Sequence, residues 1–183
     1  SDVLPAAHTD SNLVNAWGLA FTKAGVVWVG NNGTGTSTVY DANGTLGSPV
    51  VTIPPAAGST DNAPVTGVAF NAAGKGFSVT GNGVTHSAEY VFVSEAGTIS
   101  GWTPEIGNSA ANVVDNSATG AVYKGTAFIG KGKKAMLLAA NFHTGTVEAY
   151  DANFQAVATN GGFTDPSLPA GFAPFNVQAV SNK

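Results

Sequence analysis

The chain has 183 residues, of which 43% are hydrophobic, and a formal net charge of −4. A composition this apolar can bury a core, which excludes a disordered chain. Only 7 residues are Lys or Arg, too few for a basic patch, so no nucleic-acid partner is expected. The sequence has no cysteine, which excludes disulfides and thiolate metal sites. No apolar run reaches the roughly 18 residues of a membrane helix, so no membrane span is expected.

A short motif ending in alanine and phenylalanine recurs three times, at spacings of roughly 50 residues. It reads Trp17-Gly18-Leu19-Ala20-Phe21, Thr66-Gly67-Val68-Ala69-Phe70 and Lys124-Gly125-Thr126-Ala127-Phe128. After each copy come a turn, an apolar run, a Gly-Thr turn, an alternating run with an aromatic residue, and a last short run. Period-two alternation between glycine-rich turns indicates strands rather than helices. The motif therefore marks the start of three units of four strands each.

The three units follow one another along the chain. In the first unit, approximately 14–58, strands are expected at 17–21, 26–32, 37–40 and 50–53. In the second, approximately 64–116, they are expected at 66–70, 90–95, 99–102 and 112–115, with an inserted hairpin at roughly 75–88. In the third, approximately 122–163, they are expected at 124–128, 136–143, 147–150 and 155–158. Residues 172–180 have the pattern of the first strand of a further unit.

Four-stranded units at this spacing are typical of β-propeller blades. The sequence thus predicts an all-β fold in a single domain: a partial β-propeller of three four-stranded antiparallel blades plus the first strand of a fourth. Propellers have about four to eight blades, and an incomplete ring leaves unpaired edges. We therefore expect a second copy of the chain or another polypeptide to complete the propeller, unless the chain is a fragment of a longer protein.

Several segments are similar to a family of uncharacterised secreted proteins that are predicted to be six-bladed propellers of the NHL/gluconolactonase-like kind. These segments are 12–21, 32–35, 97–102, 122–125, 139–146 and 168–176. The resemblance implies secretion and a propeller but no particular activity. The chain differs from the family at Ala16, where proline is usual, and at Ala96, where aspartate is usual. It matches only the first half of these longer proteins, so a site that needs six blades is incomplete in one copy.

Polar residues recur at two places in each unit: just before the first strand and in the turn after the second. Because successive strands of a blade alternate in direction, both places should lie on one face around a central funnel. The funnel-face candidates for ligand binding are Asn15, Trp17, Asn31, Asn32, Thr66, Lys124 and Asn176. Small-molecule sites are concave and hold a few convergent polar groups, as this face would. For Lys124, the alternative is a surface lysine that lies over Tyr123.

Three further residues of this face are candidate metal ligands: Glu95, Asn141 and His143. Carboxylate and amide oxygens suit Ca²⁺ or Mg²⁺, whereas the imidazole of His143 favours a transition metal. Gluconolactonase-like enzymes hold a divalent cation in this funnel, an analogy that rests on fold alone. Alternatively, Asn31, Asn32 and Asn141 cap turns by bonding to their own backbone.

The leading functional hypothesis is a secreted, non-catalytic propeller module with a binding or assembly role. It is motivated by the low share of charged residues, 10%, and by the lack of an acid/base pair within one repeat. The alternative is a metal-dependent, lactonase-like hydrolase with Glu95, Asn141 and His143 as ligands or base. A third hypothesis is a structural surface protein that polymerises by strand addition at its open edges.

Overall fold

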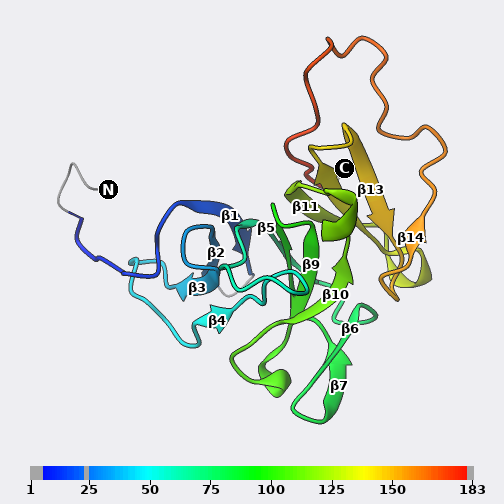
Figure 1. The fold of residues 1–183 in the computed structure, drawn as a ribbon. Coiled ribbons are helices and arrows are strands. Elements are labelled where there is room, and N and C mark those ends of the chain that lie inside the picture. Colours follow the sequence, from blue (N-terminus) through cyan, green and yellow to red (C-terminus); the bar gives the residue numbers. More distant parts are fainter. Residues whose placement is uncertain (1–5, 23–24, 181–183) are drawn as a thin grey trace.

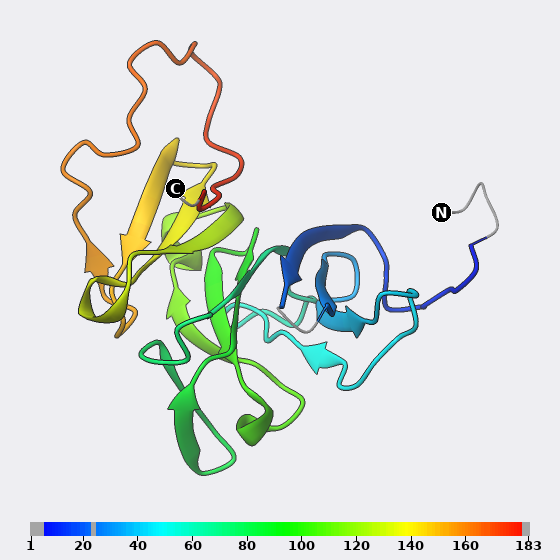
Figure 2. The same cartoon turned by 180° about the vertical axis from the view of Figure 1, so that it is seen from behind.

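The computed structural model describes residues 6–22 and 25–180 and is all-β. Within these residues the chain forms 14 strands in four antiparallel sheets (Figures 1 and 2). The helical residues lie in short 3-10 turns, η1 (Pro104–Ile106), η2 (Ser117–Thr119) and η3 (Gly132–Lys134). No helix of this part of the chain is long and apolar enough to cross a membrane. The all-β prediction is confirmed, and the arrangement is consistent with a partial propeller-like fold.

Three of the sheets are four-stranded, and each begins with one copy of the repeated motif. The first sheet contains β1 (Ala16–Phe21), β2 (Val27–Asn31), β3 (Thr36–Tyr40) and β4 (Val51–Thr52). The second contains β5 (Val65–Phe70), β8 (Tyr90–Ser94), β9 (Thr98–Trp102) and β10 (Ala111–Asp115). The third contains β11 (Tyr123–Ile129), β12 (Met136–Asn141), β13 (Thr146–Tyr150) and β14 (Ala156–Val157). The predicted insertion is a separate hairpin of β6 (Ser78–Gly81) and β7 (Val84–Ser87).

Residues 172–180 differ from the prediction, because they do not form a strand. The expected strand pattern is present in the sequence, but a strand also needs a partner, and no described residue pairs with this segment. The segment nevertheless runs beside β11, where a Cβ on Gly125 would lie 2.8 Å from the Cα of Asn176. It therefore occupies the place next to β11 without belonging to a sheet.

The first strands of the three sheets, β1, β5 and β11, approach each other closely at the glycine of the motif. A Cβ on Gly18 would lie 2.7 Å from the backbone nitrogen of Val68. A Cβ on Gly67 would lie 3.1 Å from the carbonyl oxygen of Lys124. Because only glycine lacks a Cβ, the repeated glycine permits this backbone-to-backbone approach and sets the spacing of the three strands.

The main core lies between the sheets and is rich in aromatic rings. Trp28 of the first sheet packs against Tyr90 and Trp102 of the second, with ring centroids 4.3 and 5.1 Å apart. A smaller cluster lies on the other face of the third sheet, where Leu138, Val147 and Ala149 are buried and Ile129, Met136 and Val177 pack against them. Strand alternation explains both clusters, since neighbouring residues of β12 face opposite sides.

Candidate functional site

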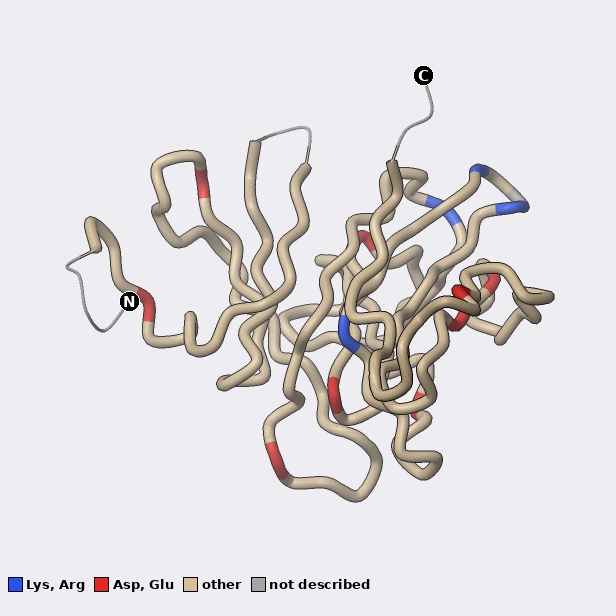
Figure 3. Tube along the Cα trace, turned by 90° about the horizontal axis from the view of Figure 1, so that it is seen from above, with Lys and Arg blue, Asp and Glu red and all other residues tan. Residues whose placement is uncertain are grey.

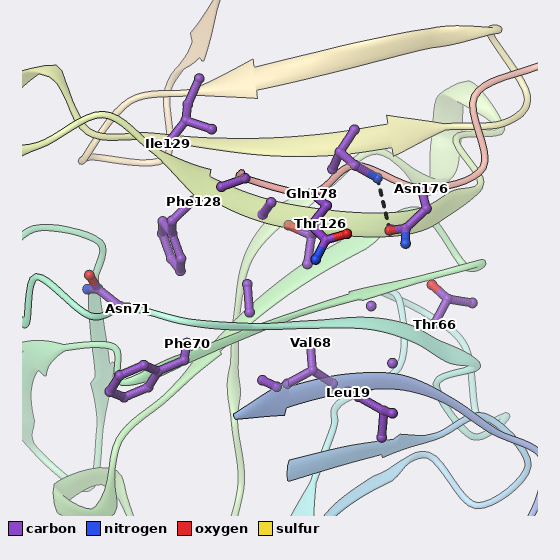
Figure 4. A pocket seen from close by; sticks show the side chains of 18 of the residues that line it. Leu19, Thr66, Val68, Phe70, Asn71, Thr126, Phe128, Ile129, Asn176 and Gln178 are labelled. Carbon is purple, nitrogen blue, oxygen red and sulfur yellow. Dashed lines mark hydrogen bonds between the residues drawn. The ribbon is translucent and has the colours of Figure 1, made fainter. Parts of the chain in front are cut away.

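Strands β1, β5 and β11, together with residues 175–179, line an open groove of about 980 Å³ (Figure 4). Thr66 and Asn176 lie at one end of the groove, and Phe70 and Phe128 lie towards the other. The side chain of Gln178 lies between these ends. The groove is therefore polar at one end, which we call the mouth, and mainly apolar beyond it, although Asn71 lies at the far end.

A chain of polar contacts adjoins the mouth, where Trp17 and Lys124 line the groove, and joins all three large sheets. The Trp17 indole N–H donates to Asn15 Oδ1, and Asn15 Nδ2 donates to Asn32 Oδ1, both at 3.0 Å. Asn32 Nδ2 donates to Glu95 Oε2, also at 3.0 Å, and the Lys124 ammonium forms an ion pair with Glu95 Oε1. We call these five residues, Asn15, Trp17, Asn32, Glu95 and Lys124, the mouth cluster. Five sequence-predicted candidates are thus brought together.

Three aromatic rings surround the ammonium group of Lys124. The nitrogen lies 4.8 Å from the ring centroid of Trp17, 5.4 Å from that of Phe175 and 5.7 Å from that of Phe142. Cation–π contacts of this kind contribute about 0.5–2 kcal/mol each, more where water is excluded. The side chain of Lys124 is only 10% exposed. It therefore lies under these rings rather than extending over Tyr123 into solvent.

The carboxylate of Glu95 is held in its ionised form. Partial burial favours the neutral acid, but hydrogen bonds from Lys124 and Asn32, together with the charge of Lys124, outweigh it and lower the pKa of Glu95. The negative charge of Glu95 and the positive charge of Lys124 compensate each other. The mouth therefore carries little net charge, in a chain whose charged residues are sparse (Figure 3).

Replacing Glu95 with glutamine should reduce stability more near neutral pH than in acid. Because the folded-state pKa of Glu95 lies below its ordinary value of 4.5, the ion pair stabilises the fold above that pH. This stabilisation is lost as the pH falls from 4.5 through the folded-state pKa. Urea unfolding of the wild type and Glu95→Gln at about pH 7 and about pH 3.5 measures the effect. Asp61→Asn, at an exposed acid, is the control. An equal loss in Glu95→Gln at both pH values would contradict this account.

Two aromatic residues of the mouth, Phe142 and Phe175, were missed by the sequence reasoning, which considered polar side chains. Phe142 directly follows β12, just as Asn32 follows β2 and Glu95 follows β8. Its equivalent position in the repeat could therefore have identified Phe142 as a residue of the mouth. Phe175 stacks on Trp17 with 5.6 Å between ring centroids, although the two residues lie at opposite ends of the sequence.

Two predicted funnel residues, Asn31 and Asn141, are buried at the ends of β2 and β12 instead of lining the mouth. Asn141 Nδ2 donates to Glu148 at 2.7 Å, and its Oδ1 accepts the backbone N–H of His143 at 3.2 Å. Asn31 Nδ2 donates to Thr38 at 3.0 Å. The contacts of Asn141 match the turn-capping alternative, and Asn31 is fixed within its own sheet.

A buried polar network lies behind the turn that carries Phe142. The hydroxyl groups of Tyr123 and Tyr150 both donate to Glu148 Oε2, at 2.7 and 2.6 Å. Asn116 Nδ2 donates to the Tyr123 oxygen at 2.7 Å. Burial raises the pKa of Tyr123 to about 12, so it stays a hydrogen-bond donor near neutral pH. Through Glu148 and its bond to Asn141, the network fixes the start of this turn.

The donor set proposed for a metal has its oxygens already engaged. Both oxygens of Glu95 contact Lys124 and Asn32, and a lysine ammonium stands where a cation would bind. Asn141 Oδ1 accepts backbone N–H groups, and the ring of His143 has no hydrogen bond within the described residues. In the same part of the chain, no three His, Asp or Glu side chains gather as metal ligands would. This arrangement does not fit a divalent cation, and the metal hypothesis remains a prediction to be tested.

Sequence comparison links the chain to two uncharacterised viral proteins. No family model matches it. Uncharacterized protein R648 of Acanthamoeba polyphaga mimivirus is 31% identical over 181 residues, which cover 94% of this chain and 42% of the relative. Uncharacterized protein L690 of the same virus is 29% identical over 180 residues, covering 94% and 46%. The chain therefore spans less than half the length of these curated relatives.

One solved structure supports the propeller-like fold. The virginiamycin B lyase of Staphylococcus aureus superposes with a TM-score of 0.53 at 12% identity, covering 80% of this chain and 42% of that one. A regucalcin from Agrobacterium tumefaciens aligns over 80% of this chain and 73% of its own, with a TM-score of 0.30 and 11% identity. At 12% identity, the first likeness concerns the propeller-like fold and not the activity.

Proposed function

We propose that this chain is a propeller-type binding module, without catalytic activity of its own, whose ligand contacts the mouth cluster. The observation that carries the proposal is the convergence of Asn15, Trp17, Asn32, Glu95 and Lys124 from three sheets, with Trp17 and Lys124 lining the groove itself. Concave sites that combine apolar walls with a few fixed polar groups are typical of ligand binding.

The state of the ionisable groups favours binding over acid–base catalysis. A general acid or base needs a pKa near the working pH, usually reached by burial or by a like charge. The pKa of Glu95 is instead lowered, and its partner Lys124 is held in the same ion pair. Exposed faces of Trp17 and Phe175 beside this pair supply contact area for an uncharged ligand with apolar parts.

A thermal-shift screen of an uncharged fragment library tests the binding proposal. Fragments that bind the mouth should stabilise the wild type and the Leu46→Ala variant, which changes another exposed apolar residue. They should lose this effect in Trp17→Ala, because the indole forms one wall of the mouth. Circular dichroism checks that each variant folds. If every stabilising fragment acts equally on Trp17→Ala, or no fragment stabilises the wild type, the mouth is not the binding site.

The second candidate function is the metal-dependent hydrolase expected from the sequence, with Glu95 just after β8, Asn141 at the end of β12 and His143 shortly after it. Melting temperatures measured in chelator and in millimolar Ca²⁺ or Mg²⁺ separate the two functions. Unchanged values support the binding module. If metal raises the melting temperature of the wild type but not of Glu95→Gln, and the protein hydrolyses a lactone, the hydrolase replaces the binding module as the proposed function.

We further propose that the three large sheets act as three blades of one domain, approximately 14–58, 64–116 and 122–163, with 172–180 as the start of a fourth. In this proposal a second copy or another polypeptide completes the ring, and the protein is secreted. Support comes from the motif repeated at the first strand of each sheet and from the family resemblance of the sequence. Molar mass from light scattering tests completion by a second copy, since an isolated monomer would exclude it.

A further inference from the structure

Residues 173–180 lie beside β11 in the way that β11 lies beside β5 and β5 beside β1. At each step a motif glycine permits the approach, and the last step brings Gly125 against Asn176. In Figure 4 this last segment runs along the groove next to β11. The segment thus occupies the fourth position in a series whose first three positions are held by strands.

This fourth position lacks the partner that the other three have. β1, β5 and β11 each pair antiparallel with the second strand of their sheet, β2, β8 and β12. Within the described residues, no backbone hydrogen bond joins 173–180 to another segment. The Val177 N–H donates to Asn176 Oδ1 at 2.9 Å, a bond inside the segment that a partner strand would have to replace. A segment whose other backbone groups lack partners is a template for strand addition.

A cavity lies beside the adjoining face of the third sheet. In the second sheet every residue of β8 and β9 is buried. On the third sheet, Leu138, Val147 and Ala149 are buried as well, with Val177 among the residues packed against them, and the connection 159–174 passes beside Val147. That connection leaves a cavity of about 300 Å³ over Val147. The cavity therefore has room for a few apolar side chains of an added strand.

The same geometry argues against a second copy that would continue the ring with its own β1. The first strand of the next unit belongs beside β11, and residues 175–179 of the same chain already lie there. A second β1 would occupy the same space. The occupant must therefore supply the second and later strands of the next unit, the second being equivalent to β12. It does not supply the first strand, because residues 175–179 already lie in that place.

We propose that residues 173–180 are a docking edge for an antiparallel β-strand from another polypeptide segment, whose apolar side chains enter the cavity lined by Val147, Ala173 and Pro174. This inference rests on the proposal that further polypeptide completes the ring. Of the two partners named there, it selects another polypeptide over a second copy of the chain. Residues 173–180 contain no charged side chain, so the partner strand should be uncharged where it pairs. The curated relatives, of which the chain spans 42% and 46%, are long enough to contain such strands.

A labelled synthetic peptide of residues 134–150, which contains β12 and β13, is the probe because β12 is the natural partner of the preceding position. Fluorescence anisotropy with the full chain should show saturable binding. Proline at position 177 or 178 removes one backbone N–H each, and neighbouring N–H groups point to opposite sides of an extended chain. At least one of Val177→Pro and Gln178→Pro should therefore weaken binding by about tenfold or more. Ala170→Pro, outside the segment, should bind like the wild type.

Hydrogen exchange gives an independent measurement. The amides of 173–180 should exchange rapidly in the chain alone and slowly in the peptide complex. No saturable binding, or equal binding by the wild type and both segment variants, would overturn the proposal. So would protection of 173–180 in a dimer of the chain without peptide, which would identify a second copy as the occupant. Fragments that bind the mouth should stabilise the wild type in the absence of peptide, so failure of either proposal can be recognised separately.

Discussion

Replacing Trp102 with alanine is expected to lower the free energy of unfolding by about 3–5 kcal/mol. The side chain is only 1% exposed, and its ring packs against Trp28 across the boundary between the first and second sheets. Its indole N–H donates to the carbonyl of Gly107 at 2.6 Å. The substitution leaves a cavity between two sheets and a carbonyl without its donor, and both are costly. Urea unfolding followed by circular dichroism measures the loss.

Trp17→Ala is the matched control, because it removes the same side chain from a place where it is 37% exposed. Its loss of stability should be clearly smaller, since less apolar surface returns to water. Equal losses in the two variants would mean that the Trp28–Trp102 contact does not hold the first two sheets together.

The strands could be predicted from the sequence because their signal is local. In β12, Leu137 and Ala139 face the main core, whereas Leu138 faces the smaller cluster on the other side. Such a fully apolar run between turn residues is typical of a strand buried on both faces. Burial on both faces follows from stacking the sheets, which the repeated motif indicated. Residues 172–180 form no strand in the structure, although their pattern predicted one, because pairing depends on a partner, and a local pattern carries no information about one.

The candidate site was predictable only in outline. The repeat places Asn31 and Asn32 at the same turn, yet their side chains serve different purposes because neighbouring residues face opposite sides. Asn31 is buried against Thr38, and Asn32 reaches Glu95 at the mouth. Which of the two side chains reaches the mouth therefore depends on a shift of one residue along the chain. The sequence located the turn but not which of its residues faces the mouth. The ion pair with Lys124 likewise joins two sheets whose packing distance no sequence pattern specifies.

Alanine at Gly67 should destabilise the protein by about 1–3 kcal/mol, the usual cost of forcing extra atoms into a packed interior. The new Cβ would lie 2.7 Å from Cγ2 of Val93 and 3.1 Å from the carbonyl oxygen of Lys124. β5 lies between β1 and β11, so relief requires a shift of paired strands on at least one side. Such a shift would also separate Lys124 from Glu95. Urea unfolding measures the destabilisation.

Gly125→Ala adds the same methyl group at the equivalent position of the third sheet, but there the neighbour is Asn176. Because residues 173–180 have no strand partner, this segment can move away at little cost, and the loss of stability should be well below that of Gly67→Ala. The movement would carry Phe175 off Trp17, so the fluorescence of this exposed tryptophan should change. A loss as large as that of Gly67→Ala, with unchanged fluorescence, would show that the segment is held as firmly as a paired strand. The docking edge would then not be available.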